Sequence, residues 1–388
     1  MKNINDDKGN KPGILILYHC KANTGYAIGT LEKVFWESVL GLTKDVCKIH
    51  LSYTSYASGN PDYVPEGYNN LIEFDPESCD RRDLLTIQEY VLKNNIKIIL
   101  GFDQPPKRSY YKVVRDAGVD RIISYYGAPM SSLNGAFKLA LKRVSFWFAR
   151  SGPDCYVFES KGMERTATHG RGISPEKTKI CKIGVDTQKF RPDGKDAFYA
   201  HDTLGISREK KLLFYSGHFE DRKGISVIMA AANELVQERT DFVFVLFGNT
   251  KEQEAKFRPM LSESARDHVH FGGYRDDLNR IHRSCYLGVI ASIGWDSFTV
   301  SSIEMQSSGL PLVLSDLLGL QEAIVHEQTG IHFPPGDGFQ LASVVSRLLE
   351  DPSERDRMAE GARERVIKEF SRENQIACLT KILENHLI

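Results

Sequence analysis

Apolar runs and amphipathic stretches alternate along the first half of the chain. The runs GILILYHC, VCKIHLSY, KIILGF, RIISYY, CYVFES and ICKIGV predict buried strands. Between them, TLEKVFWESVLGL, DLLTIQEYVLKNNI, SYYKVVRDAGV and residues 136–150 have the apolar spacing of helices. Such an alternation predicts a mostly parallel sheet with helices on both faces.

The same pattern starts again in the second half. The polar stretch from Gly194 to Gly205 is typical of a linker, and KLLFYSG, FVFVLFG, HVHFGG, YLGVIAS and LPLVLS then predict strands with helices between them. The last stretch, ARERVIKEFSRENQIACLTKILENHL, predicts a helix that breaks near Phe370. We therefore expect an α/β protein with two doubly wound domains, residues 1–192 and 193–371, followed by a helix at about 372–388.

Composition adds limits to this picture. A chain of 388 residues is long enough for two domains, and its net charge of −1 gives no reason to expect nucleic acid as a partner. Seven scattered cysteines without a CxxC pair favour free thiols in a reducing compartment. The polar residues 1–13 are expected to be a frayed start and not a signal peptide, and no apolar run approaches the ~20 residues that span a bilayer. These features predict a soluble cytoplasmic protein.

The stretch DSFTVSSIEMQSSGLP, residues 296–311, lies between two apolar runs and carries two acids, Asp296 and Glu304. A helix that opens near Phe298 would aim the N–H groups of Thr299 and Val300 at a phosphate. Glu304 could accept two hydrogen bonds from a ribose. The alternative is a surface helix whose first turn favours an acid for electrostatic reasons.

A second candidate is the turn SGHFEDRKG, residues 216–224, between a predicted strand and a predicted helix. Lys223, helped by Arg222 or His218, could neutralise a diphosphate there, and the glycines let the backbone approach it. The alternative is a solvated charged turn.

Four segments in order resemble the GT-B glycosyltransferases of family 4, a large and mostly retaining group. They are GVDTQKFRP, SGHFEDRKG, DSFTVSSIEMQSSGLPLV and EAIVHEQTGIHFPPGD. The similarity is strong over about residues 180–375 and extends to the first half only in layout. It implies two Rossmann-like domains that face a cleft, with a C-terminal helix that returns to the N-terminal domain. The first domain would bind the acceptor and the second the nucleotide-sugar donor.

The resemblance also implies roles for individual residues. Glu304 would bind the ribose, Asp296 the hydroxyl groups of the donor sugar, and Lys223 the diphosphate. Gly25 would approach the phosphate and the acceptor from the first domain. The implied donor-binding residues are Gly25, Gly217, His218, Arg222, Lys223, Ser297, Phe298, Thr299, Val300 and Glu304, and the implied catalytic residues are Lys223, Asp296, Asp103 and Tyr126.

Three positions depart from the pattern of the family. Asp296 stands where Glu is usual, His218 where Arg is usual, and Tyr126, near Asp103, where His is common. The implied activity is retaining transfer of a hexose from a UDP- or GDP-sugar, with UDP favoured, to a hydroxyl of a small-molecule, glycan or lipid-linked acceptor. No cofactor or metal is expected. The departures motivate an alternative, a catalytically silent protein that serves as a nucleotide-sugar-binding or partner subunit.

Residues 136–150 allow two interpretations. The predicted helix carries a basic set and an aromatic set, namely Lys138, Lys142, Arg143 and Arg150, and Phe137, Phe146, Trp147 and Phe148. Such a helix could lie on the inner face of a membrane as a peripheral contact. A core-packed helix with a solvated basic edge is the favoured interpretation.

Overall fold

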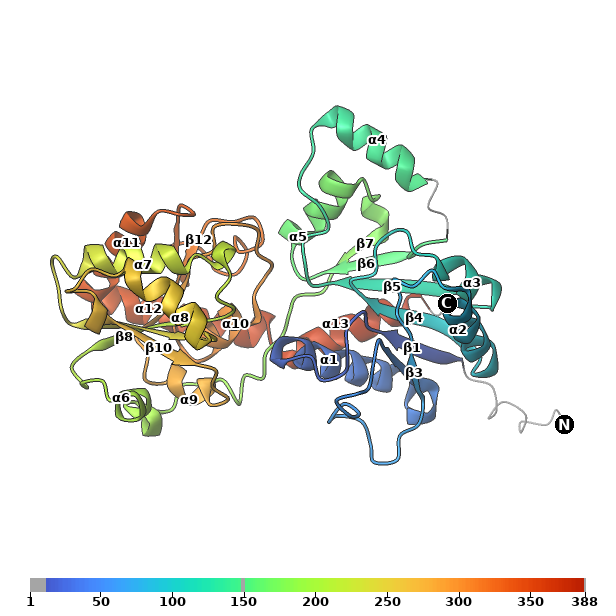
Figure 1. The fold of residues 1–388 in the computed structure, drawn as a ribbon, viewed down its shortest axis with the longest axis horizontal. Coiled ribbons are helices and arrows are strands. Elements are labelled where there is room, and N and C mark those ends of the chain that lie inside the picture. The colour runs from blue at the N-terminus through green and yellow to red at the C-terminus, as the bar shows by residue number, and fades with distance from the viewer. Residues whose placement is uncertain (1–11, 148–150, 387–388) are drawn as a thin grey trace. The chain divides into compact units, whose positions relative to one another are not determined.

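The structure is a computed structural model that describes residues 12–147 and 151–386, and it divides into two compact units (Figure 1). Unit 1 contains the chain up to Lys182 and the C-terminal stretch from Glu373, and unit 2 contains Ile183–Arg372. The boundary expected at residue 192 lies inside unit 2, because the residues before it pack there. Val185 pairs with Ser371 in an isolated bridge.

Unit 1 is built on one parallel sheet of seven strands in the order β3-β2-β1-β4-β5-β6-β7. The strands are β1 (Gly13–Leu17), β2 (Ile49–Tyr53), β3 (Leu71–Glu73), β4 (Ile96–Phe102), β5 (Arg121–Tyr126), β6 (Cys155–Phe158) and β7 (Thr178–Ile180). The strand order reverses between β1 and β4. That reversal creates a switch point at which parallel sheets bind ligands.

The helices of unit 1 cover both faces of this sheet (Figure 1). They are α1 (Tyr26–Thr43), α2 (Arg81–Lys93), α3 (Tyr110–Asp116), α4 (Ala136–Trp147), α5 (Lys161–Arg165) and α13 (Arg372–Glu384), with short turns η1 (Val46–Lys48), η2 (Thr166–Arg171) and η3 (Pro175–Lys177). Apolar residues of α1 and α13 form one core cluster with the sheet, and those of α2 and α3 form another. The return of the C-terminal helix to the first unit is thereby confirmed.

Unit 2 repeats the architecture with six parallel strands in the order β10-β9-β8-β11-β12-β13. The strands are β8 (Lys211–Ser216), β9 (Phe242–Phe247), β10 (Val269–Gly273), β11 (Leu287–Ile290), β12 (Leu312–Ser315) and β13 (Gly330–Phe333). The helices are α6 (Tyr199–Leu204), α7 (Ile225–Leu235), α8 (Lys251–Phe257), α9 (Leu278–His282), α10 (Val300–Ser307), α11 (Gly338–Glu350) and α12 (Pro352–Glu369), with turns η4 (Gly194–Asp196), η5 (Asp221–Lys223), η6 (Arg258–Met260) and η7 (Arg266–His268). Its switch point lies between β8 and β11. The prediction of an α/β fold with two doubly wound domains is confirmed.

Three details differ from the sequence-based prediction. The run ICKIGV is not one strand, since β7 ends at Ile180. The edge strands β3, with three residues, and β13, whose four residues include Gly330 and His332, were not expected. Runs of that length carry little periodicity.

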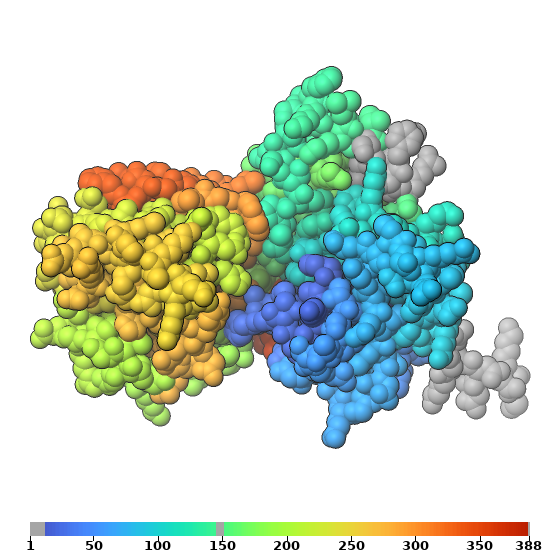
Figure 2. Space-filling view, viewed as in Figure 1, coloured from blue at the N-terminus to red at the C-terminus, as the bar shows by residue number. Residues whose placement is uncertain are grey.

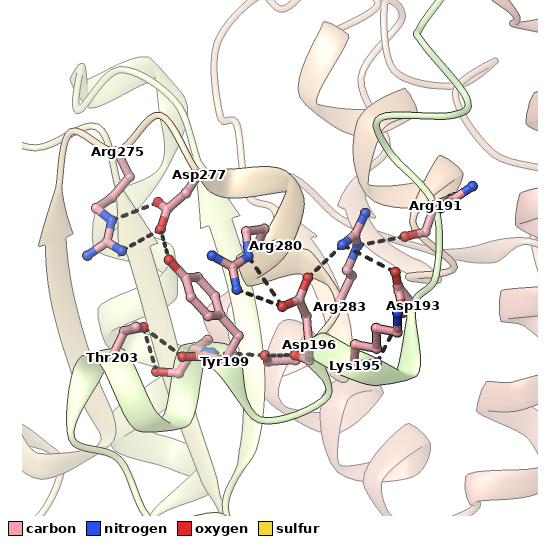
Figure 3. A network of polar contacts seen from close by, with 12 residues as sticks. Arg191, Asp193, Lys195, Asp196, Tyr199, Thr203, Arg275, Asp277, Arg280 and Arg283 are labelled. Carbon is pink, nitrogen blue, oxygen red and sulfur yellow. Dashed lines mark hydrogen bonds and ion pairs between the residues drawn. The ribbon is translucent and has the colours of Figure 1, made fainter.

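The stretch after residue 193 is anchored and is not a free linker (Figure 3). Asp196 forms ion pairs with Arg280 at 2.9 Å and Arg283 at 2.6 Å. The hydroxyl of Tyr199 donates a hydrogen bond of 2.6 Å to Asp277. The polar residues that suggested a linker therefore hold η4 and α6 against α9.

Across residues 12–147 and 151–386, the structure contains no helix with the length and apolar content needed to cross a bilayer.

Candidate functional site

The candidate site in unit 2 lies at its switch point. Strands β8 and β11 are hydrogen-bonded neighbours, with Leu287 opposite Leu213. The chain leaves their carboxyl ends in two turns, residues 217–224 after β8 and 291–299 after β11. The two segments that the sequence singled out for phosphate and sugar chemistry therefore lie side by side.

A buried ion pair joins the two turns. The ammonium of Lys223 lies 2.8 Å from both carboxylate oxygens of Asp296. The side chain of Asp296 is 2% exposed and that of Lys223 is 15% exposed. Ion pairs with this little solvent around them are far less screened than surface pairs.

Further donors fix the carboxylate of Asp296. The hydroxyl of Ser292 donates to one oxygen at 2.6 Å, and the backbone N–H of Ser297 donates to the other at 3.0 Å. Both carboxylate oxygens thus accept two hydrogen bonds each. Sequence reasoning missed Ser292, which lies just after the apolar run YLGVIA.

Close backbone contact locks the turn after β8 against the end of β11. Gly224 has φ of 69°, and a Cβ at this position would lie 1.7 Å from the carbonyl oxygen of Ala291. The N–H of Ile293 donates to the carbonyl of Arg222 at 2.8 Å. Only glycine fits at position 224, and its fit places Lys223 next to Asp296.

The other basic residues of the turn have different surroundings. Arg222 donates to Glu220 at 2.6 Å, and its guanidinium stacks 4.0 Å above the ring of Trp295. It approaches Asp296 to 3.9 Å. His218 is exposed, and its carbonyl accepts a hydrogen bond from Tyr215. Arg222 is therefore the second cation near Asp296, whereas His218 lies at the exposed edge of the turn.

Gly217 begins the turn immediately after β8. Its N–H donates to the carbonyl of Phe247 at 3.1 Å, and an added Cβ would lie 2.9 Å from the hydroxyl oxygen of Tyr215. A side chain at position 217 would contact the ring of Tyr215, so only glycine leaves the backbone accessible at this position.

Helix α10 begins at Val300, two residues after the expected position. Thr299 is the N-cap, and its hydroxyl accepts a hydrogen bond from the N–H of Ser302 at 3.3 Å. The N–H groups of Val300 and Ser301 belong to the opening turn, which has no intrahelical acceptors. The hydroxyl of Ser301 also lies 2.8 Å from that of Ser216, which links the helix to β8.

The remaining residues of this segment are Glu304, Phe298 and Ser297. Glu304 is buried on α10, and Phe298 is buried in the core, where its ring stacks on Phe370 at 5.3 Å. The side chain of Phe298 is therefore not available to a donor, and only its backbone borders the site. Ser297 is half-buried and holds Asp296 through its N–H.

Unit 1 places Asp103 at its own switch point, just after β4. Asp103 has φ of 51°, a conformation that non-glycine residues seldom adopt, and its carboxylate accepts the N–H of Gly127 at 2.9 Å. Burial raises the pKa of Asp103 to about 6, although the Gly127 N–H and His19 oppose the shift. The buried carboxyl of Glu159, after β6, has its pKa raised by burial and by the charge of Asp103.

His19 and Glu159 were not identified from the sequence. His19 follows β1, its Nδ1 lies 3.1 Å from the carbonyl oxygen of Phe102, and its ring stacks on that of Phe102. The available signal was their position, since each comes directly after an apolar run (GILILY and CYVF). Polar side chains at the carboxyl ends of neighbouring parallel strands converge.

The two remaining residues of unit 1 differ in accessibility. Tyr126 is buried, and its ring packs 5.8 Å from that of Phe158 and 6.3 Å from that of Tyr156. Burial raises the pKa of its hydroxyl, so this tyrosine is a core residue and a poor proton donor. Gly25 is exposed before α1, and a Cβ there would meet no atom within 4 Å.

Within residues 12–147 and 151–386, no three His, Cys, Asp or Glu side chains are grouped so that they could hold a metal ion.

Sequence comparison connects part of the chain with known proteins. Residues 199–365 match the family model of the glycosyl transferases group 1. A glycogen synthase from Mycobacterium tuberculosis is 26% identical over 61% of this chain and 55% of its own length. The N,N'-diacetylbacillosaminyl-diphospho-undecaprenol alpha-1,3-N-acetylgalactosaminyltransferase of Campylobacter jejuni is 26% identical over 58% and 57%. The chain thus spans about half the length of the curated relatives it matches.

Structural comparison covers nearly the whole chain. A glycosyltransferase from Rickettsia africae has a TM-score of 0.79 at 16% identity, over 97% of this chain and 99% of that one. Anabaena HepE in complex with UDP has a TM-score of 0.75 at 16% identity, over 96% and 100%. The chain therefore has the GT-B fold, and its residues 199–365 are similar to the glycosyl transferases group 1.

Proposed function

We propose that this protein transfers a hexose from a nucleotide-diphosphate sugar, with a UDP-sugar favoured, to an acceptor hydroxyl, with retention of configuration and without a metal. The observation that carries the proposal is the buried Lys223–Asp296 pair at the switch point of unit 2, beside the opening turn of α10. It brings a cation and backbone N–H groups to one place, as a diphosphate requires.

The chemistry follows from where charge develops. Breaking the bond between sugar and diphosphate places negative charge on the leaving group, so donors fixed beside it stabilise the transition state more than the ground state. A lysine ammonium has three N–H donors. Two of those of Lys223 face Asp296 in the described contacts, which leaves one for a phosphate oxygen.

Asp296 suits a positioning role in this scheme. Its two oxygens already accept hydrogen bonds from Lys223, Ser292 and Ser297, and it is buried. Direct contact with sugar hydroxyls would require it to exchange one of these partners. We therefore assign Asp296 mainly to holding Lys223, and Glu304 to the ribose.

Relatives support the donor class. Anabaena HepE has been solved with UDP and with UDP-glucose, and the Campylobacter relative is named for transfer of N-acetylgalactosamine. In unit 1, Asp103 is the residue we assign to the acceptor, whereas the burial of Tyr126 argues against its catalytic role. A cytoplasmic location agrees with the free cysteines found among the described residues.

Nucleotide-sugar binding and turnover test the proposal. Wild-type protein is titrated with UDP- and GDP-sugars and then assayed for nucleotide release with and without EDTA. Glu304→Gln should weaken donor binding at least about tenfold, as expected for loss of a charged hydrogen bond. Lys223→Met should lower kcat about 10²-fold or more, the usual effect of losing one stabilising donor. The control is Glu252→Gln, which changes an exposed acid of α8.

The outcomes separate the proposal from its alternative. Absence of binding by any nucleotide sugar contradicts the proposed function. Binding without turnover, unaffected by Lys223→Met, would instead support a catalytically silent binding subunit. Retention is checked from the anomeric configuration of the product by NMR, and loss of activity in EDTA would contradict metal independence.

A further inference from the structure

Helix α4 turns its apolar side to solvent. Phe137, Leu141 and Val144 recur at helical spacing and form one stripe, with exposed fractions of 80%, 58% and 58%. Leu139, on the opposite side of the helix, is buried. The favoured prediction of a core-packed helix is therefore wrong for Phe137, Leu141 and Val144, since a core-packed helix would bury these side chains. The side chains of residues 145–150 lie outside those described.

Contacts on the opposite side of α4 determine which way the apolar stripe faces. The ammonium of Lys142 donates to the carbonyl of Gly170 at 2.9 Å and to the hydroxyl of Ser131 at 3.0 Å. At Gly172, an added Cβ would lie 2.8 Å from the backbone nitrogen of Arg143. Helix α4 thus rests on η2 by close backbone approach, so it cannot turn its stripe inward without losing these contacts.

The charges around the stripe are of one sign. No acidic residue occurs between Asp120 and Asp154, although the chain as a whole has a net charge of −1. Lys138 and Arg143 are exposed on α4, and Arg171 is exposed on η2 beside it. Burial, and then the neighbouring charges of Arg171 and Lys138, lower the pKa of Lys142.

The position of α4 makes this surface accessible within unit 1. The helix lies at the outer side of the unit, where it rests on η2 (Figure 1). It forms a projecting ridge in the space-filling view (Figure 2). An apolar stripe with flanking lysine and arginine on a projecting helix is typical of helices that lie in a lipid interface.

We propose that α4 binds the surface of an anionic lipid bilayer. The stripe of Phe137, Leu141 and Val144 would enter the boundary between head groups and acyl chains, and Lys138 and Arg143 would pair with lipid phosphates. An apolar protein partner would account for the stripe but not for the cations around it. An anionic lipid surface accounts for both. This inference goes beyond glycosyl transfer and does not depend on it.

Vesicle co-sedimentation without nucleotide sugar tests the proposal. Vesicles of phosphatidylcholine alone are compared with vesicles that also contain phosphatidylglycerol, at low and high salt. Wild-type protein should bind the anionic vesicles, and the binding should weaken with salt. The triple variant Phe137→Ser, Leu141→Ser, Val144→Ser and the double variant Lys138→Glu, Arg143→Glu should each bind at least about tenfold less, because each removes one of the two attractions.

The matched control changes exposed leucines on another helix of the same unit. Leu85 and Leu92 on α2 are 45% and 59% exposed, and the double variant Leu85→Ser, Leu92→Ser should bind vesicles as the wild type does. Circular dichroism and thermal unfolding confirm that each variant is folded. Absence of binding to anionic vesicles, or binding unchanged in the triple variant, overturns the proposal. Self-association of the wild type that the triple variant abolishes would also overturn it, in favour of a second copy of the chain.

Discussion

At the scale of single residues, the two candidate acids differ in how they are held. Asp296 accepts hydrogen bonds from Lys223, Ser292 and the N–H of Ser297. Asp103 has one backbone donor, lies beside the buried Glu159, and is largely buried itself. The first environment holds the side chain in one position, and the second raises the pKa of Asp103, so that its carboxyl keeps its proton to higher pH.

The raised pKa of Asp103 makes the stability of unit 1 depend on pH. A carboxyl whose pKa is about 6 in the folded protein and about 3.9 when unfolded destabilises the fold progressively as pH rises through that range. Asp103→Asn is neutral at every pH and can still accept the N–H of Gly127. Its melting temperature should exceed that of the wild type by an amount that grows between about pH 4 and 6 and is constant above about 7.

Thermal unfolding at a series of pH values measures this difference. Glu89→Gln, an exposed change on α2, is the control and should show no such gain. A constant difference between Asp103→Asn and the wild type from pH 4 to 8 would contradict the assigned titration.

At the scale of elements, the fit of one turn decides the geometry of the candidate site. Gly224 ends η5 with φ of 69°, in contact with the carbonyl of Ala291 at the end of β11. Gly205 has nearly the same φ, 67°, but a Cβ there would meet nothing within 4 Å. A substitution at Gly205 would carry only the cost of the left-handed conformation, whereas one at Gly224 would add the cost of a clash between the new Cβ and the backbone of Ala291.

Alanine at each of these glycines should give different losses of stability. Gly205→Ala should lower the free energy of unfolding by about 1–2 kcal/mol, the cost of the left-handed conformation alone. Gly224→Ala should lower it further, since β11 and the turn after β8 must move apart. It should also weaken donor binding, because Lys223 is the preceding residue.

Urea unfolding and nucleotide-sugar titration check both effects. Equal losses of stability in the two variants would mean that the turn adapts without strain. Donor binding in Gly205→Ala should match the wild type.

At the scale of the whole molecule, the chain forms two units that each have their own cores. Helix α13 belongs to unit 1 although it comes last in the sequence, and Leu379 and Leu383 are fully buried in a cluster with α1 and the sheet. The amide of Gln375 donates to the hydroxyl of Tyr125 at 2.9 Å. The C-terminal helix is therefore a structural part of the first unit.

Two core substitutions should act on different units. Leu379→Ala on α13 should destabilise unit 1, and Leu348→Ala on α11 should destabilise unit 2, each by about 2–5 kcal/mol. Differential scanning calorimetry should then show that each variant lowers a different part of the unfolding transition. If both variants lower the same single transition equally, the two units unfold as one.

Much of the fold could be predicted from the sequence, because it depends on local burial. The alternation of apolar runs and amphipathic stretches identified most strands and helices and the repeat of the pattern in two domains. It missed β3, which has only three residues, and β13, whose apolar run is interrupted by His332. The basic turn and the acidic segment were also recognisable, since their residues are contiguous.

Only the tertiary structure decided which of these residues meet. Lys223 and Asp296 are 73 positions apart and form an ion pair because β8 and β11 are neighbours. Tyr126 was a site candidate and became a core residue, whereas Phe137 was assigned to the core and is exposed. Periodicity encodes that a position is apolar or polar, but the packing of elements determines which side of a helix or strand is covered.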